Sequence, residues 1–202
     1  GIDSPVAAYL MMKRGCSVKF VHFFNDSINS RAALEKIKEL VKILSQYNKN
    51  TKLHVVPFKD IQSEIIKYVP SEYRMIVYRR IMFMIAEMLA KRDEAKALVT
   101  GDNLAQVASQ TLDNMGVIRS STDMLVLTPV LGMDKQEIVN LAKKIGTYET
   151  SIQPYEDCCS FYIAKHPATK SKIGDIQKIE KRLYLKKLMT EAIGKKEIVG
   201  SS

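Results

Sequence analysis

Short strand-like runs of apolar residues alternate with helical segments along the chain, and this alternation limits the fold more than any other feature. Strands are expected at residues 17–24, 52–57, 97–100 and 124–128. Apolar side chains at helical spacing, or helix caps, mark the segments between and around them. These helical segments are 4–15, 30–47, 60–69, 78–91, 103–114, 134–146 and 173–193. We therefore expect an α/β fold: an open, doubly wound, mostly parallel sheet with helices on both faces and a C-terminal helical extension.

Some of these helices carry recognisable end signals. Ser4 and Pro5 open the first helix, because proline suits the first helical position. Ser30 is expected to be the N-cap of the second helix. Asp134 and Glu137 have the spacing of a capping box, in which each side chain accepts a hydrogen bond from the backbone N–H of the other residue. Residues 147–172 carry no such pattern and are expected to be irregular.

Lysine and arginine outnumber the acidic residues by 31 to 22, which gives a net charge of +9. Much of the excess lies after residue 165, and a basic end favours a polyanionic partner such as RNA. A surface rich in lysine and glutamate, as in thermophilic proteins, is the alternative explanation. No apolar run approaches the roughly 18 residues that span a bilayer, and no secretory signal is found. We therefore expect a cytoplasmic protein with no membrane partner.

The three cysteines, Cys16, Cys158 and Cys159, do not have the number or spacing of a structural zinc site. They suit a reducing compartment better than a disulfide framework. Cys16 lies beside a predicted strand and is expected to be buried. An iron–sulfur cluster would need a third ligand besides the adjacent pair, and Cys16 is poorly placed in the sequence to supply it.

The first residues, Gly1-Ile2-Asp3-Ser4-Pro5, have the composition of a phosphate-binding turn at a helix N-terminus. Glycine lets the backbone approach a ligand closely, and the free N–H groups of the first helical turn attract anions. Ser4 can add a hydroxyl donor, and Asp3 can hold a Mg²⁺ ion that bridges phosphates. A capped surface helix would explain the same short motif. Ligands of doubly wound sheets bind at the carboxyl ends of strands, so further contacts are expected at 22–24 and 100–106.

Longer segments carry a resemblance to a known family. The first residues resemble the end of the SGGxDS signature of PP-loop ATP pyrophosphatases, which cleave ATP between the α and β phosphates, although the leading Ser and Gly are absent. Within that superfamily the chain resembles the tRNA uridine 4-sulfurtransferases, the 4-thiouridine synthetase or ThiI family, over residues 1–172. Four segments in the family's order carry this resemblance: YRRIM at 78–82, TGDNLAQVASQTL at 100–112, PVLGMDKQEI and IGT within 129–147, and PYEDCC at 154–159.

The resemblance implies an enzyme that uses ATP and Mg²⁺. Its catalytic residues would be Asp3, which holds the metal, Lys135, which stabilises phosphate charge, and Cys158, which transfers sulfur from a persulfide. Cys159 departs from the family pattern and is the alternative thiol. Gln106 is expected to lie one helical turn from Gln110 on the same face. The residues implied to bind the nucleotide are Gly1, Ser4, His22, Phe23, Arg79, Gly101 and Gln106.

By the same resemblance, ATP adenylates O4 of a tRNA uridine and releases pyrophosphate, after which sulfur attacks C4 and AMP leaves. Residues 1–172 would form the catalytic domain and 173–202 a basic helix and tail. The implied partners are tRNA, a persulfide donor such as a cysteine desulfurase, or free sulfide, and N-terminal ferredoxin-like and THUMP domains of a longer protein. A homodimer and a role in thiamine thiazole sulfur supply are left open.

Two alternative functions stay open at this point. One is a different PP-loop tRNA-modifying enzyme of the 2-thiouridine type, against which the segment TGDNLAQVASQTL argues. The other is a non-catalytic nucleotide- or RNA-binding module, which the incomplete phosphate-loop signature favours.

Overall fold

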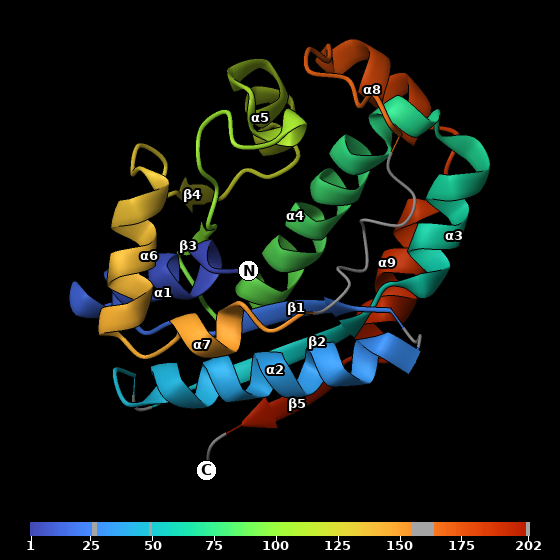
Figure 1. Ribbon diagram of the computed structural model, residues 1–202. Helices are drawn as coiled ribbons and strands as arrows, with labels where there is room; N and C mark the ends of the chain where they lie inside the picture. Colours follow the sequence, from blue (N-terminus) through green and yellow to red (C-terminus); the bar gives the residue numbers. More distant parts are fainter. Residues whose placement is uncertain (26–27, 49, 155–163, 201–202) are drawn as a thin grey trace.

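A computed structural model describes residues 1–25, 28–48, 50–154 and 164–200 (Figure 1). The strands are β1 (Phe20–Phe24), β2 (Lys52–Pro57), β3 (Ala97–Val99), β4 (Leu125–Leu127) and β5 (Glu197–Gly200). The first helices are α1 (Asp3–Lys13), α2 (Ile28–Ser45), α3 (Lys59–Tyr68), α4 (Arg74–Arg92) and α5 (Leu112–Arg119). They are followed by α6 (Lys135–Lys144), α7 (Tyr148–Ser151), α8 (Ile173–Glu180) and α9 (Leu185–Gly194). None of the helices in these ranges has the length and apolarity needed to cross a bilayer.

The strands pair mostly in parallel. β1 runs parallel to β2, with Phe20 opposite Leu53, and β3 runs parallel to β4, with Ala97 opposite Leu125. β5 joins the other edge of β2 in the antiparallel direction, with Val199 opposite Leu53. Within the described ranges no strand hydrogen bonds join β1 to β3, so the sheet consists of a three-stranded and a two-stranded part.

Helices cover both faces of this sheet, because alternate side chains of a strand point to opposite sides. Val21 and Phe23 of β1 pack into one core with α3, α4 and α9, whereas Phe20 packs into a second core with α1, α2 and α6. β3 divides in the same way, with Leu98 in the first core and Val99 in the second. The expected doubly wound α/β fold is therefore confirmed.

The segment after β3 differs from expectation. Residues 103–114 were expected to form one helix, but only the short 3₁₀ turn Ala108–Gln110 occurs before α5 begins at Leu112. Ala105 has a left-handed backbone with φ of 60°, and the Leu104 N–H donates to the Leu131 carbonyl at 3.0 Å. These tertiary hydrogen bonds replace helical ones, and they fold the segment back over the turn that precedes α6.

The C-terminal region differs as well. The single helix expected over 173–193 is two helices, α8 and α9, because Leu183 and Leu185 are both buried although they lie only two residues apart. Residues at that spacing face different sides of one continuous helix. The strand β5 was not expected, and α7 lies within a stretch expected to be irregular.

The structure differs from the sequence prediction at Ser30 and Cys16, and it confirms the predicted capping box. α2 begins at Ile28, so Ser30 lies inside the helix and is not its N-cap. Cys16 is exposed and not buried. The capping box is confirmed, with Asp134 and Glu137 each accepting the other's backbone N–H at 2.8 Å.

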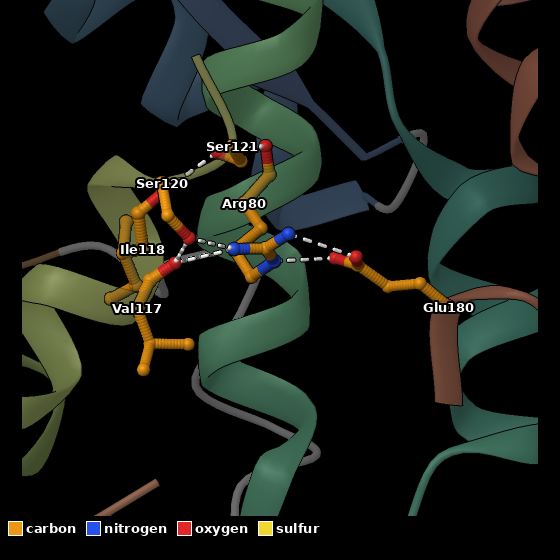
Figure 2. A network of polar contacts seen from close by, with 6 residues as sticks. All are labelled: Arg80, Val117, Ile118, Ser120, Ser121 and Glu180. Atoms are coloured by element: carbon orange, nitrogen blue, oxygen red, sulfur yellow. Dashed lines mark hydrogen bonds and ion pairs between the residues drawn. The ribbon is translucent and has the colours of Figure 1, made fainter. Parts of the chain in front are cut away.

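The C-terminal helices belong to the same core as α4. Ile176 of α8 and Ile193 of α9 are fully buried there. Arg80 of α4 also binds Glu180 of α8, the carbonyl of Val117 in α5 and the hydroxyl of Ser120 (Figure 2). Arg80 thereby links three helices that come from distant parts of the chain.

Candidate functional site

The N-terminus of α1 packs directly against the loop that follows β3. In the view of Figure 1 the start of the chain lies between α1 and β3 on one side and α4 on the other. A Cβ atom built on Gly101 would lie 2.6 Å from the backbone nitrogen of Ser4 and 2.8 Å from the carbonyl carbon of Asp3. Only glycine lets two backbones approach so closely. Gly101 therefore brings the carboxyl end of β3 onto the helix turn that the sequence predicts to bind phosphate.

Asp102, the next residue, gathers side chains from three segments. Its Oδ1 atom accepts a hydrogen bond from Nη2 of Arg79 at 2.5 Å and from Nε2 of Gln110 at 3.3 Å. Its Oδ2 atom accepts one from the hydroxyl of Thr100 at 2.9 Å. The Asp102 side chain is buried, and Arg79 comes from α4. The ion pair thus fixes an α4 arginine beside the loop that contacts the α1 N-terminus.

The side chain of Asn103 connects the loop after β3 to the turn before α6. The side-chain amide of Asn103 donates to the carbonyls of Val130 and Met133, at 3.0 and 2.6 Å. Met133 lies immediately before the capping box, and Lys135 is the first residue of α6. The loop after β3 therefore determines where Lys135 lies relative to α1.

Lys135 and Asp3 interact electrostatically. Partial burial raises the pKa of Asp3 above its ordinary value, the nearby Lys135 ammonium opposes this shift, and the negative charge of Asp102 adds to it. A cation in the first turn of a helix opposes the helix dipole, so Lys135 gains little from α6 itself. Lys135 is close enough to Asp3 to lower the pKa of its carboxyl group, and Arg79 pairs with Asp102 in the loop that contacts α1, so an anionic ligand at the α1 N-terminus would be stabilised.

A cavity of about 820 Å³ adjoins these residues. Gly1, Ser4 and Gly101 line it together with His22 and Phe23 from the carboxyl half of β1. The remainder of the cavity runs between β1 and β3. The Phe23 ring packs edge to face on Phe58, with 5.3 Å between ring centroids. Its side chain therefore belongs to the core, and the backbone of β1 is the part that can face a ligand.

The structure brings together most of the residues singled out in the sequence. Gln106 is the exception, because it lies exposed in the loop after β3, and the helix expected to align it with Gln110 is absent. Gln110 is buried and points to Asp102 instead. Cys158 and Cys159 lie outside the described residues.

Two residues that the sequence did not single out, Asp102 and Lys36, are prominent in the structure. Asp102 directly follows Gly101 at a strand end, a position at which carboxylates commonly meet ligands or their partners. Lys36 is almost fully buried in α2, and its Nζ donates to the carbonyls of Ser151 and Gln153 at 2.7 and 2.9 Å. Desolvation lowers the pKa of Lys36. Its helical spacing from the buried Leu40 was a usable signal.

The described residues suit a Mg²⁺ ion that is held by one carboxylate together with the phosphates of a substrate. In the described part of the chain, no three His, Cys, Asp or Glu side chains converge as metal ligands. Mg²⁺ is usually held by one or two carboxylates together with substrate phosphates. Asp3 at the α1 N-terminus suits that mode, whereas the oxygens of Asp102 are already engaged by Arg79, Thr100 and Gln110.

Comparison with known proteins identifies the family. The profile of the family described as thiamine biosynthesis protein (ThiI) matches residues 1–185. The chain belongs to the ThiI family. This confirms the resemblance carried by the segments at 78–82, 100–112 and 129–147.

Individual members of the ThiI family are similar over nearly the whole chain. A probable tRNA sulfurtransferase of Acetivibrio thermocellus is 47% identical over 199 residues, which cover 98% of this chain and 51% of that protein. The protein of the same description from Caldanaerobacter subterraneus subsp. tengcongensis is 48% identical over 189 residues, 94% of this chain and 50% of that protein. The chain thus spans about half the length of these relatives.

A solved structure extends the comparison to the fold. The crystal structure of a 4-thiouridine synthetase–RNA complex with bound ATP matches with a TM-score of 0.95 and 41% sequence identity. The match covers all of this chain and 53% of that chain. The arrangement of helices on both faces of the sheet is therefore that of the ThiI family.

Proposed function

We propose that this chain is the ATP-using catalytic part of a tRNA sulfurtransferase that converts a tRNA uridine to 4-thiouridine. One observation carries the proposal: Gly101 lies on the Asp3–Ser4 backbone, with Arg79 paired to the adjacent Asp102 and Lys135 close enough to Asp3 to lower the pKa of its carboxyl group. Such an arrangement of helix N-terminus, close backbone and two cations suits a polyphosphate. The relatives' description as tRNA sulfurtransferases and the bound ATP and RNA in the related structure support the choice of substrates.

In the first step, O4 of the uridine attacks the α phosphate of ATP, an O–P bond forms, and pyrophosphate leaves. The first-turn N–H groups of α1 and the Ser4 hydroxyl bind the phosphates, while Lys135 and Arg79 offset the negative charge that accumulates on the leaving pyrophosphate. A Mg²⁺ ion held by Asp3 would supply further neutralisation of phosphate charge.

In the second step a sulfur nucleophile attacks C4, and the C4–O bond breaks to release AMP. Adenylation makes this step feasible because AMP is a far better leaving group than oxide or hydroxide. We propose that this nucleophile is the terminal sulfur of a persulfide, so its attack leaves C4 joined to the donor cysteine through an S–S bond. The Cys158 thiolate then attacks the donor sulfur of that bond, which frees 4-thiouridine and leaves a disulfide between Cys158 and the donor that a cellular thiol reduces. Cys159 is the alternative thiol, and both cysteines lie outside the described residues. The persulfide would come from a cysteine desulfurase or be replaced by free sulfide.

The remaining partners follow from the substrate. tRNA would be held partly by segments of the full-length protein beyond this chain, for which ferredoxin-like and THUMP domains are proposed, and the reaction would take place in the cytoplasm. Supply of sulfur for thiamine thiazole is proposed as a second use of the same persulfide chemistry. A homodimer is compatible with these roles.

The proposal is tested by 4-thiouridine formation in unmodified tRNA by the full-length protein with ATP, Mg²⁺ and sulfide. Lys135→Ala is compared with Lys144→Ala, which removes the same charge from the far end of α6. Loss of a preorganised charge-stabilising group typically costs roughly 100-fold or more in rate, so Lys135→Ala and Asp3→Ala should nearly abolish thiolation. Lys144→Ala should retain it. Because sulfide bypasses the persulfide, Cys158→Ser tests separately whether this thiol is still needed when sulfide is the sulfur source.

Two results would contradict the proposal. If the wild-type protein releases pyrophosphate without forming 4-thiouridine, the ATP chemistry is correct and the substrate is wrong. If it binds ATP but releases no pyrophosphate with any tRNA, the chain acts as a nucleotide-binding module and not as an enzyme.

A further inference from the structure

We infer that Asp102 is a positioning residue of the nucleotide site, which holds Arg79 so that the free N–H groups of its guanidinium face the phosphates of ATP. This inference rests on the proposed function, and it goes beyond it by assigning a role to a carboxylate that touches no reacting atom.

Arg79 uses only one of its three guanidinium nitrogens within the described residues. Nη2 donates to Asp102, whereas Nε and Nη1 donate to no group within the described ranges. The side chain is only 17% exposed, and the bond from Nη2 to Asp102 holds the guanidinium at one of its nitrogens. A guanidinium presents its N–H groups in a rigid plane that matches phosphate oxygens in pairs. Arg79 is thus oriented by one edge and has another edge available for an anion.

The Arg79–Asp102 pair lies close to the N-terminus of α1. Asp102 follows Gly101 directly, and Gly101 contacts the backbone of Asp3 and Ser4. The negative charge of Asp102 is also close enough to Asp3 to raise the pKa of the Asp3 carboxyl group. The Arg79–Asp102 pair therefore lies next to the helix N-terminus at which the phosphates would bind.

The hydrogen bonds of Asp102 favour a positioning role over metal binding. A carboxylate offers about four lone-pair positions, and three donors already occupy the two oxygens of Asp102: Arg79, Gln110 and Thr100. A guanidinium as nearest neighbour would also repel a metal cation. Asp102 is therefore suited to orient a cation of the protein and not to bind Mg²⁺.

Gln110 supports the same conclusion. Its Nε2 donates to Asp102, but its Oε1 is buried and has no hydrogen-bond partner within the described part of the chain. A buried oxygen without a donor lowers stability. This orientation of the amide keeps a donor on the Asp102 carboxylate, which indicates that the cluster is organised around that charge.

The test uses the full-length protein with tRNA, ATP and sulfide, and measures KM for ATP and the rate of pyrophosphate release at saturating ATP. A catalytic group displaced by about 1 Å can lose roughly 100-fold in rate, so Asp102→Asn should lower that rate by about tenfold to 100-fold. Asp102→Glu, which keeps the charge, should recover most of the loss. Glu87→Gln is the matched control, because Glu87 is an ion-paired carboxylate of α4 away from the site.

A double-mutant cycle separates positioning from an independent role. If Asp102 acts through Arg79, the variant Arg79→Gln/Asp102→Asn should be no slower than Arg79→Gln alone. Multiplicative effects of the two substitutions, or a wild-type rate in Asp102→Asn, would overturn the inference. Should Asp102→Asn fail to fold, Thr100→Val carries the same test, since it removes one donor from Asp102 and its effect must vanish in the Arg79→Gln background.

Failure of the inference and failure of the proposed function give different results. If the wild-type protein releases no pyrophosphate, the proposed function fails, and the ATP affinity measured by calorimetry then decides the inference. Asp102→Asn must weaken ATP binding as much as Arg79→Gln does, with no further loss in the double variant. Unchanged ATP affinity in Asp102→Asn would overturn it.

Discussion

Arg80 and Glu180 form a buried, two-point ion pair across 100 residues of sequence (Figure 2). Nε of Arg80 donates to Oε1 of Glu180 at 2.6 Å, and Nη2 donates to Oε2 at 2.9 Å. The third nitrogen, Nη1, donates to the Val117 carbonyl and the Ser120 hydroxyl. The buried guanidinium is thereby supplied with acceptors from α5 and α8, so both helices depend on a charge in α4.

Glu180→Leu should destabilise the protein strongly. It leaves the guanidinium of Arg80 buried without its counter-charge, which typically costs about 3–5 kcal/mol. The free energy of unfolding in urea measures this effect. Asp175→Asn is the matched control in α8, because its ion pair with Lys178 is exposed, and it should change stability by less than about 0.5 kcal/mol. A loss below about 1 kcal/mol for Glu180→Leu would contradict the account of a buried pair.

Gly101→Ala should abolish nucleotide binding. The added methyl group would press on the backbone of Ser4 and Asp3 and push the loop after β3 away from α1. Calorimetric titration with ATP measures the loss. Gly116→Ala in α5 is the control, since a Cβ there meets nothing within 4 Å, and it should bind ATP normally while gaining up to about 1 kcal/mol of stability. Wild-type ATP affinity in Gly101→Ala would show that the close contact is not required.

Lys36→Met should separate the two steps of the proposed reaction. Lys36 of α2 donates to the carbonyls of Ser151 and Gln153, which precede the segment that carries Cys158. It is not among the residues that line the cavity next to Gly1, Ser4 and Gly101. We expect persulfide-dependent thiolation to fall by about tenfold or more, because the thiol must be aligned with the reacting carbon. Pyrophosphate release should stay near the wild-type rate. Equal losses in both measurements would mean that Lys36 supports the whole fold and not the sulfur-transfer segment.

Asp93 should contribute stability that depends on pH. Burial raises the pKa of Asp93, but hydrogen bonds from His54 and Lys19 outweigh it, so the net pKa lies below the ordinary 3.8. A carboxyl group with a lowered pKa in the folded state stabilises that state above its unfolded pKa, and this contribution is lost as the pH falls through the folded value.

Urea unfolding of Asp93→Asn at several pH values checks this expectation. The stability difference from wild type should shrink as the pH falls below about pH 4, because Asp93 is then protonated in both the folded and the unfolded state. Asp60→Asn removes an exposed carboxylate and should show little difference throughout. A difference between wild type and Asp93→Asn that persists unchanged into acid would contradict the assigned cause.

The sequence predicted the fold where local signals and tertiary packing agree. The bounds of β2 and the capping box of α6 are both confirmed, because their hydrophobic pattern and cap residues agree with their surroundings. The loop after β3 was mispredicted because its hydrogen bonds go to Leu131, a partner that no local pattern reveals. β5 was missed because four residues that pair with β2 carry too short a pattern to recognise.

The candidate site shows the same limit. Gly101, Asp3, Ser4 and Lys135 stand in motifs, so the sequence alone could propose roles for them. Asp102 could not be assigned a partner, because its ion pair with Arg79 joins residues 23 positions apart on different elements. Such pairings depend on how helix and sheet pack together, and a single sequence does not contain that information directly.

β5 has a consequence for handling the protein. It pairs with the outer edge of β2 along Lys52 to Val55. Without it, the N–H and C=O groups of this edge could hydrogen bond to a strand of another molecule. The strand that covers it is short, is preceded by Lys195 and Lys196, and is itself a poor template for further growth. Deleting β5 would therefore be expected to promote aggregation through the uncovered edge of β2, so this short strand contributes to solubility as well as to the sheet.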